Sequence, residues 1–123
     1  MNMTGKYVDG FVVPVPKNNI DAYRHMSETM GKLWKEHGAL EYVECIADDV
    51  KPGKVTSFPQ AVKLEEDEVV VFSWIVYESR EHRDQVNAAV MKDPRLEKMM
   101  EPEATPFDAK RMIYGGFRAA VEV

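Results

Sequence analysis

Apolar residues recur along this chain at two spacings, every second residue in some segments and every third or fourth in others. The first spacing predicts strands at Tyr7–Val15, Ala39–Val50, Glu68–Tyr77 and Lys110–Val121. The second predicts a helix from Asn18, its N-cap, to the C-capping Gly38, another from Ser79 to about Lys92, and a short one over Pro94–Met100. The strands and two long helices follow the order β-α-β-β-α-β, which is the ferredoxin-like α+β arrangement with an antiparallel sheet.

Two of the predicted strands are apolar on both of their faces. In Glu68–Tyr77, the set Val70, Phe72, Trp74 and Val76 alternates with Val69, Val71, Ile75 and Tyr77. Both helices of this arrangement cover the same face of the sheet, so the other apolar face needs a separate cover. A second copy of the chain supplies one by symmetry and predicts a homodimer with its sheets face to face. The alternative is that the long connection Lys51–Asp67 folds over that face within one chain.

Composition narrows the class of protein. The 123 residues, 45% hydrophobic and 30% charged, predict a single globular domain spanning 1–123. The net charge of −5 and the absence of a basic stripe argue against nucleic acid and membrane surfaces as partners. No segment has the length of a membrane helix, the first ten residues lack a signal-peptide core, and there is one cysteine, Cys45. A cytoplasmic location is therefore expected.

Several distinctive segments point to a known family. YVDGFVVPVP, ALEYVECIADDV, VVVFSWIVYESREHRDQVNAAVMKDPR and FDAKRMIYGGF resemble the YbaA-like family of small bacterial proteins, catalogued as a domain of unknown function. The resemblance runs nearly end to end and implies membership of the dimeric α/β barrel superfamily. Relatives in that superfamily include cofactor-independent monooxygenases, haem-degrading enzymes, and decarboxylating or dechlorinating enzymes. The resemblance implies no catalytic residues for this chain.

A few residues are candidates for a site. Glu44 and Asp9 stand inside apolar strands, where an unpaired charge is costly, and an ion pair with Arg111, Arg118 or Lys63 would be a purely structural reason for them. Aromatic residues are expected at the helix–sheet interface, which often opens into a ligand cavity in this superfamily. The predicted pocket residues are Glu44, Trp74, Tyr114, His82, Tyr23 and Trp34. A lone histidine such as His82 is more often structural than catalytic.

Two functions fit these observations. In the first, the protein binds a small apolar or aromatic molecule in a helix–sheet cavity gated by Lys51–Lys63, as a binding protein or as a cofactor-independent, monooxygenase-like enzyme. In the second, it is a non-catalytic dimeric stress or protein-interaction module with a solid core. No nucleotide loop, metal-ligand spacing or nucleophile motif is present in the sequence, so neither cofactor nor metal is predicted. The residues do not decide whether the protein is an enzyme.

Overall fold

The computed structural model describes residues 5–99 and 105–123. Its strands are β1 (Tyr7–Pro16), β2 (Glu41–Ile46), β3 (Glu68–Tyr77) and β4 (Ile113–Arg118). Its α-helices are α1 (Ile20–Glu36), α2 (Phe58–Ala61), α3 (Arg80–Met91) and α4 (Pro94–Met99), and two 3-10 turns, η1 (Lys17–Asn19) and η3 (Ala109–Arg111), precede α1 and β4. No helix among the described residues is long and apolar enough to span a membrane.

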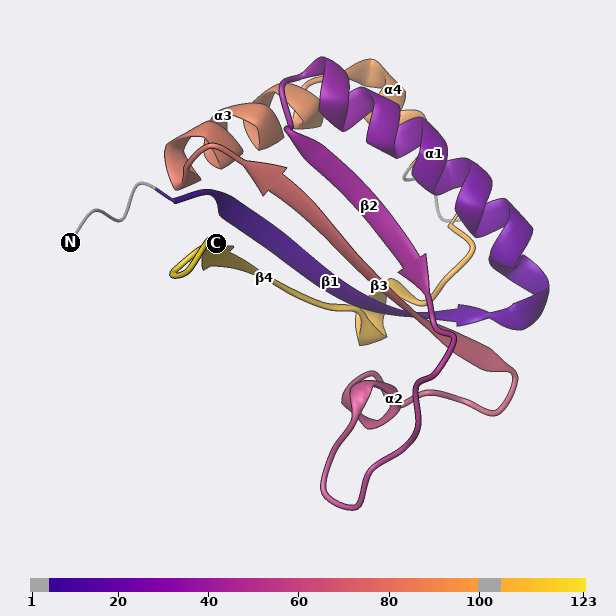
Figure 1. Ribbon diagram of the computed structural model, residues 1–123. Helices are drawn as coiled ribbons and strands as arrows, with labels where there is room; N and C mark the ends of the chain where they lie inside the picture. The colour runs from indigo at the N-terminus through magenta and orange to yellow at the C-terminus, as the bar shows by residue number, and fades with distance from the viewer. Residues whose placement is uncertain (1–4, 100–104) are drawn as a thin grey trace.

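The strands form one antiparallel sheet in the order β2-β3-β1-β4. Figure 1 shows α1, α3 and α4 together on one side of this sheet, with β4 at the edge farthest from β2. This is the predicted ferredoxin-like topology, and the α+β fold class is confirmed. The central strands β1 and β3 pair along their whole lengths, from Tyr7↔Tyr77 to Pro16↔Glu68.

Most predicted helix ends agree with the structure. Ser79 caps α3 by accepting a hydrogen bond from the backbone N–H of His82. Gly38 follows α1 with φ of +115°, the left-handed conformation for which a C-terminal glycine is preferred. The predicted N-cap of α1 was wrong, because Asn18 lies within the 3-10 turn η1 and the helix starts two residues later, at Ile20.

Two strands are shorter than predicted. β2 ends at Ile46, before the exposed acidic pair Asp48 and Asp49. The β1–β4 ladder ends at Val12↔Ile113, whereas the β1–β3 ladder runs on to Pro16. Pro14, two residues past the end of the β1–β4 ladder, has no N–H to extend it, which accounts for the late start of β4.

Alternation of side chains divides the sheet into two surfaces. The helix face carries Tyr7, Asp9, Phe11, Tyr42, Glu44, Ser73, Ile75 and Tyr114, and its apolar members pack with α1 and α3 residues such as Leu33 and Val86. The open face carries Gly10, Val12, Val43, Phe72, Trp74, Val76, Ile113 and Phe117. The core therefore lies between the helix face and the helices.

The connection between β2 and β3 covers only one end of the open face. Val62, which follows α2, packs against Val12 and Val70, and Phe58 contacts Phe72 with ring centroids 5.8 Å apart. Figure 1 shows α2 on the side of the sheet opposite the long helices. The described residues leave the rest of the open face uncovered, since Phe117 is 64% exposed and Ile113 is 44% exposed.

Candidate functional site

A cavity of about 310 Å³ lies between the helix face and the helices. Most of its lining is apolar, from aromatic residues and four methionines: Phe11, Trp34, Phe107, Tyr114, Met26, Met30, Met91 and Met112. Its polar groups are grouped at two places, Glu44 with Tyr23 and Tyr42, and Asp9 with Arg83 and Asn87. The two carboxylates are two strands apart and two residues out of register, so their Cα atoms are separated by roughly 12 Å.

The first polar group is a carboxylate held by two phenols. Tyr23 of α1 donates its hydroxyl to Glu44 Oε1 at 2.5 Å, and Tyr42, two residues away on the same face of β2, donates to Oε2 at 3.0 Å. Burial and then the charge of Glu44 raise the pKa of both tyrosines above the usual range. Both hydroxyls therefore stay protonated and donate to the carboxylate.

Close packing fixes the position of Tyr42. Gly31 of α1 lies against its ring, and a Cβ at that position would stand 2.8 Å from Tyr42 Cδ1. Only glycine lets the helix approach the strand this closely without displacing the ring. The spacing between α1 and β2 is thereby set where Glu44 is held.

The second polar group is an ion pair. Arg83 of α3 donates from Nη1 to Asp9 Oδ1 at 2.7 Å, and its guanidinium lies 4.9 Å from the centroid of the Tyr7 ring. Burial raises the pKa of Asp9, while the charge of Arg83 and its hydrogen bond act in the opposite direction. Asp9 and Arg83 together bring no net charge to the cavity.

Asn87 links this ion pair to the aromatic wall. Its Oδ1 accepts hydrogen bonds from Trp34 Nε1 and from the Tyr77 hydroxyl, both at 3.2 Å. The indole of Trp34 is thus oriented by a side chain from another helix. Arg83, Val86, Asn87 and Val90 have the spacing of one helical face, which places these polar residues on the inner side of α3 with the buried valines.

A larger, open groove of about 890 Å³ runs outside the cavity, between α1 and the edge strand β2. Tyr23, Tyr42 and Glu44 border both spaces. These three residues therefore form the wall between the inner cavity and the outer groove. On the opposite edge, the cavity reaches the surface at Tyr114, which is 73% exposed and stacks on Phe11.

Five of the six predicted pocket residues border the cavity: Glu44, Tyr23, Trp34, Tyr114 and Trp74. His82 is not among the lining residues. Its Nδ1 accepts a hydrogen bond from the backbone N–H of Glu78, and its ring packs edge-on against Tyr77. These contacts fit a structural role for His82.

Trp74 borders the cavity, but its indole lies on the open face, contrary to the prediction that it lines the helix–sheet interface. The ring packs against Phe72 at 5.7 Å, and Nε1 donates to Glu41 at 2.9 Å. Both neighbours belong to the open face by alternation along β2 and β3. The cavity is bordered on this strand by the inward side chains of Ser73 and Ile75.

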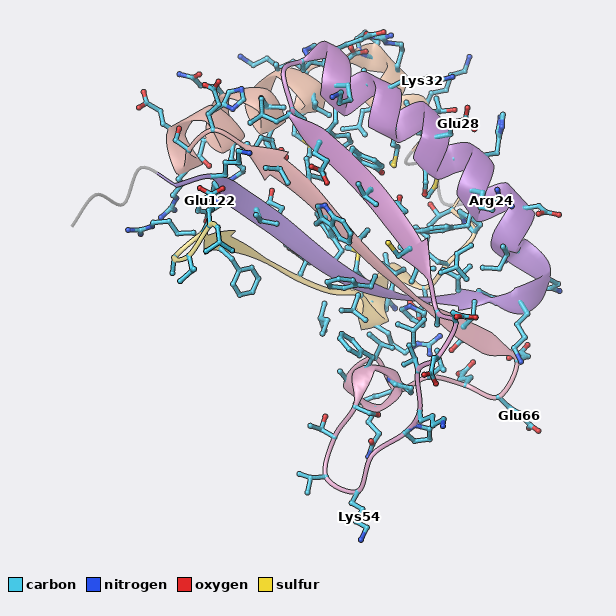
Figure 2. All side chains as sticks on the ribbon, in the orientation of Figure 1. Arg24, Glu28, Lys32, Lys54, Glu66 and Glu122 are labelled. Carbon is cyan, nitrogen blue, oxygen red and sulfur yellow. The ribbon has the colours of Figure 1, made fainter. Side chains whose placement is uncertain are left out.

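The predicted gate was also wrong. No residue of Lys51–Lys63 lines the cavity, because that connection lies under the open face, and Figure 2 shows Lys54 at the end of the molecule away from α1. The connection is held on the open face by its apolar residues, because Val62 is almost fully buried against β1 and β3.

Within the chain, the two carboxylates do not have the predicted ion-pair partners Arg111, Arg118 or Lys63. Asp9 pairs with Arg83, and Glu44 has two tyrosines. Arg111 instead binds the buried Glu68 through both terminal nitrogens, at 2.7 and 2.6 Å, and this hydrogen bonding holds the pKa of Glu68 below its usual range.

Sequence reasoning missed Tyr42, Ser73, Arg83 and Asn87 as lining residues. Tyr42 had a readable signal, since it lies two residues from Glu44 and so on the same face of a strand. Within the described residues, no group of three or more His, Cys, Asp or Glu side chains is arranged to hold a metal ion.

Two solved structures share the fold over nearly the whole chain. A dimeric ferredoxin-like protein from an uncultured marine organism has a TM-score of 0.61 and 14% identity, and the match covers 97% of this chain and 99% of that one. A NIPSNAP-like domain protein from Burkholderia xenovorans has a TM-score of 0.59 and 15% identity, covering 98% and 90%. At such low identity, these similarities show the fold alone.

Sequence comparison identifies much nearer relatives. The protein YbaA, described as uncharacterized, from Escherichia coli strain K12 is 56% identical over 117 residues, which are 95% of this chain and 98% of YbaA. YbaA of Shigella flexneri matches equally well. The family model described as "Protein of unknown function (DUF1428)" matches residues 6–109. The chain therefore belongs to the DUF1428 family, together with YbaA.

Proposed function

We propose that the protein binds a small molecule with an apolar or aromatic body in the cavity between the helix face and the helices. The observation that carries this proposal is the cavity itself, about 310 Å³ in volume with an apolar lining and grouped polar side chains. Ligand sites have volumes of roughly 300–1,000 Å³ and, like this cavity, combine an apolar lining with a few polar side chains. The cavity is at the small end of this range and suits a fragment-sized ligand.

The alternative, an interaction module with a solid core, fits this interior poorly. Packed cores have few voids larger than one water molecule, whose share of liquid volume is about 30 Å³. The cavity here is about ten times larger. Oxidation without a cofactor, the reaction class suggested by the family resemblance, stays a prediction.

We further propose that the chain works as a homodimer through its open face. Phe72, Ile113 and Phe117 are 42%, 44% and 64% exposed on that face, a set that one polypeptide leaves in water. A two-fold partner presents the same set and can bury about 800 Å² per subunit, the standard size for a stable interface. The ferredoxin-like structural neighbour is itself described as dimeric, which supports a dimer of this chain.

Replacing Ser73 with leucine tests cavity binding. Ser73 is buried on the helix face, opposite Glu44 in the β2–β3 register, and lines the cavity. We expect Ser73→Leu to keep or raise the midpoint of thermal unfolding, because filling a void adds packing contacts. Aromatic fragments such as indole and naphthol should bind the wild type and bind the variant at least tenfold more weakly, since the side chain occupies their space, as measured by ligand-observed NMR.

The matched control is Val76→Leu, which adds volume to the same strand on the open face and should leave fragment binding unchanged. Equal binding of fragments by wild type and Ser73→Leu would place them outside the cavity. A wild type that binds no fragment of the library at all would contradict the proposal.

A further inference from the structure

The charges around the cavity do not balance. Asp9 is neutralised by Arg83, whose other nitrogens donate to Asp84 Oδ1 and to the Tyr7 hydroxyl. The hydrogen-bond partners that Glu44 has among the described residues are two neutral phenols. Among the described residues it makes no ion pair at all. The cavity therefore carries one uncompensated carboxylate.

Cations elsewhere in the fold do not correct this imbalance. Arg24, Lys32 and Lys35 border the outer groove and are exposed, with Lys32 paired to Glu28 and Lys35 donating to the Leu40 carbonyl. Figure 2 shows Arg24, Glu28 and Lys32 on the outer side of α1. The two segments outside the described residues, 1–4 and 100–104, contain no lysine or arginine in their sequences.

An uncompensated carboxylate selects its ligand by charge. A ligand that fills the cavity displaces water from Glu44, and removing water from an unpaired charge costs free energy. An anionic ligand adds repulsion to this cost, and a neutral ligand offsets it only in part through one hydrogen bond. A protonated amine offsets it with both a charge and hydrogen-bond donors.

The walls next to Glu44 favour the same kind of ligand. Tyr23 and Tyr42 hold the carboxylate, Phe107 packs edge-on against Tyr23 with centroids 5.7 Å apart, and Trp34 lies 6.3 Å from Tyr42. Aromatic faces attract cations most strongly where water is excluded. Aromatic rings next to a lone carboxylate form an environment suited to an ammonium group on an apolar body.

We propose that the ligand of the cavity is a protonated amine with an aromatic or aliphatic body, bound with its ammonium group at Glu44 between Tyr23 and Tyr42. This assignment rests on the proposed function of the cavity and names its ligand class. The apolar body of the ligand lies along the methionine and aromatic wall, toward Phe11 and Tyr114.

Three compounds of one shape test the assignment: tryptamine, tryptophol and indoleacetate, which carry a cation, a neutral hydroxyl and an anion on the same indole. By titration calorimetry at neutral pH, tryptamine should bind the wild type at least tenfold more tightly than tryptophol, and indoleacetate should bind most weakly. Glu44→Gln keeps the shape of the side chain and removes its charge. In this variant, the preference for tryptamine over tryptophol should disappear.

Glu41→Gln is the matched control, because Glu41 lies on the same strand with its carboxylate on the open face, accepting from Trp74. It should keep the full preference for tryptamine. The ranking on the wild type stands as a test even if Glu44→Gln folds poorly. Tryptophol or indoleacetate binding as tightly as tryptamine, or a preference that survives in folded Glu44→Gln, would overturn the amine assignment and leave cavity binding intact.

If none of the three compounds binds, the amine assignment is wrong. The fragment comparison between wild type and Ser73→Leu then decides separately whether the cavity binds any molecule. The failure of the ligand class and the failure of the proposed function are therefore distinct results.

Discussion

Replacing Arg83 with methionine is expected to lower the free energy of unfolding by about 3–5 kcal/mol at neutral pH, because it leaves a buried carboxylate without its partner. Asp9 is 6% exposed, and Arg83 is the cation that binds it, at 2.7 Å. Both side chains are mostly removed from water, so solvent screens their attraction little. Urea unfolding monitored by circular dichroism measures the difference.

The free energy of unfolding that is lost in Arg83→Met should depend on pH in a defined direction. Burial raises the pKa of folded Asp9 above its ordinary value of 3.8. At pH values between 3.8 and this raised pKa, the folded state binds more protons than the unfolded state. Stability contributed by this residue therefore falls as pH rises through that window. Without Arg83 the folded pKa rises further, so the deficit of Arg83→Met should be largest at neutral pH and shrink toward pH 4.

The control for this prediction removes both charges. Asp9→Asn combined with Arg83→Met should recover most of the lost stability, because no unpaired charge remains in the interior. A deficit below about 1 kcal/mol that does not change with pH would mean that Asp9 is compensated by another group.

Replacing Phe117 with glutamate is expected to convert a dimer into a monomer. Phe117 is 64% exposed in one chain, so the charge costs little in the fold of a monomer. In a face-to-face dimer the new carboxylate is buried twice, once in each copy, and a total cost of about 4 kcal/mol weakens association roughly 10³-fold. Analytical ultracentrifugation across micromolar concentrations measures the change.

Tyr114→Glu is the matched control for the dimer interface, since Tyr114 is similarly exposed on the same strand and points to the helix face. It should leave the sedimentation of the dimer unchanged. A wild type that sediments as a monomer at micromolar concentration would refute the homodimer.

The sequence predicted the features that depend on local pattern. The helical spacing of Tyr23, Met30 and Leu33 placed α1, and the apolar runs of β1 and β3 placed the two central strands. The order of these elements was enough for the ferredoxin-like topology. The two-sided apolar character of β3 correctly indicated that one face would remain uncovered, since the connection reaches only the end near Val62.

The candidate site was less predictable because its contacts join distant segments. Asp9 and Arg83 are 74 residues apart, and no local rule chose Arg83 over the other arginines. The alternation in β3 separated Trp74 from Ser73 and Ile75 without showing which set faces the helices. Glu44 was found because a charge inside an apolar strand needs a partner, but its phenol partners come from α1 and from its own strand.

The central claim, that the cavity between helices and sheet binds a small molecule, is tested most directly by NMR of protein labelled at the methionine methyl groups. Among the described residues, four methionines line the cavity: Met26, Met30, Met91 and Met112. On titration with tryptamine, we predict saturable shifts of these four methyl signals in the wild type and their loss in Ser73→Leu. Saturable tryptamine binding that leaves all four signals unmoved would contradict the claim.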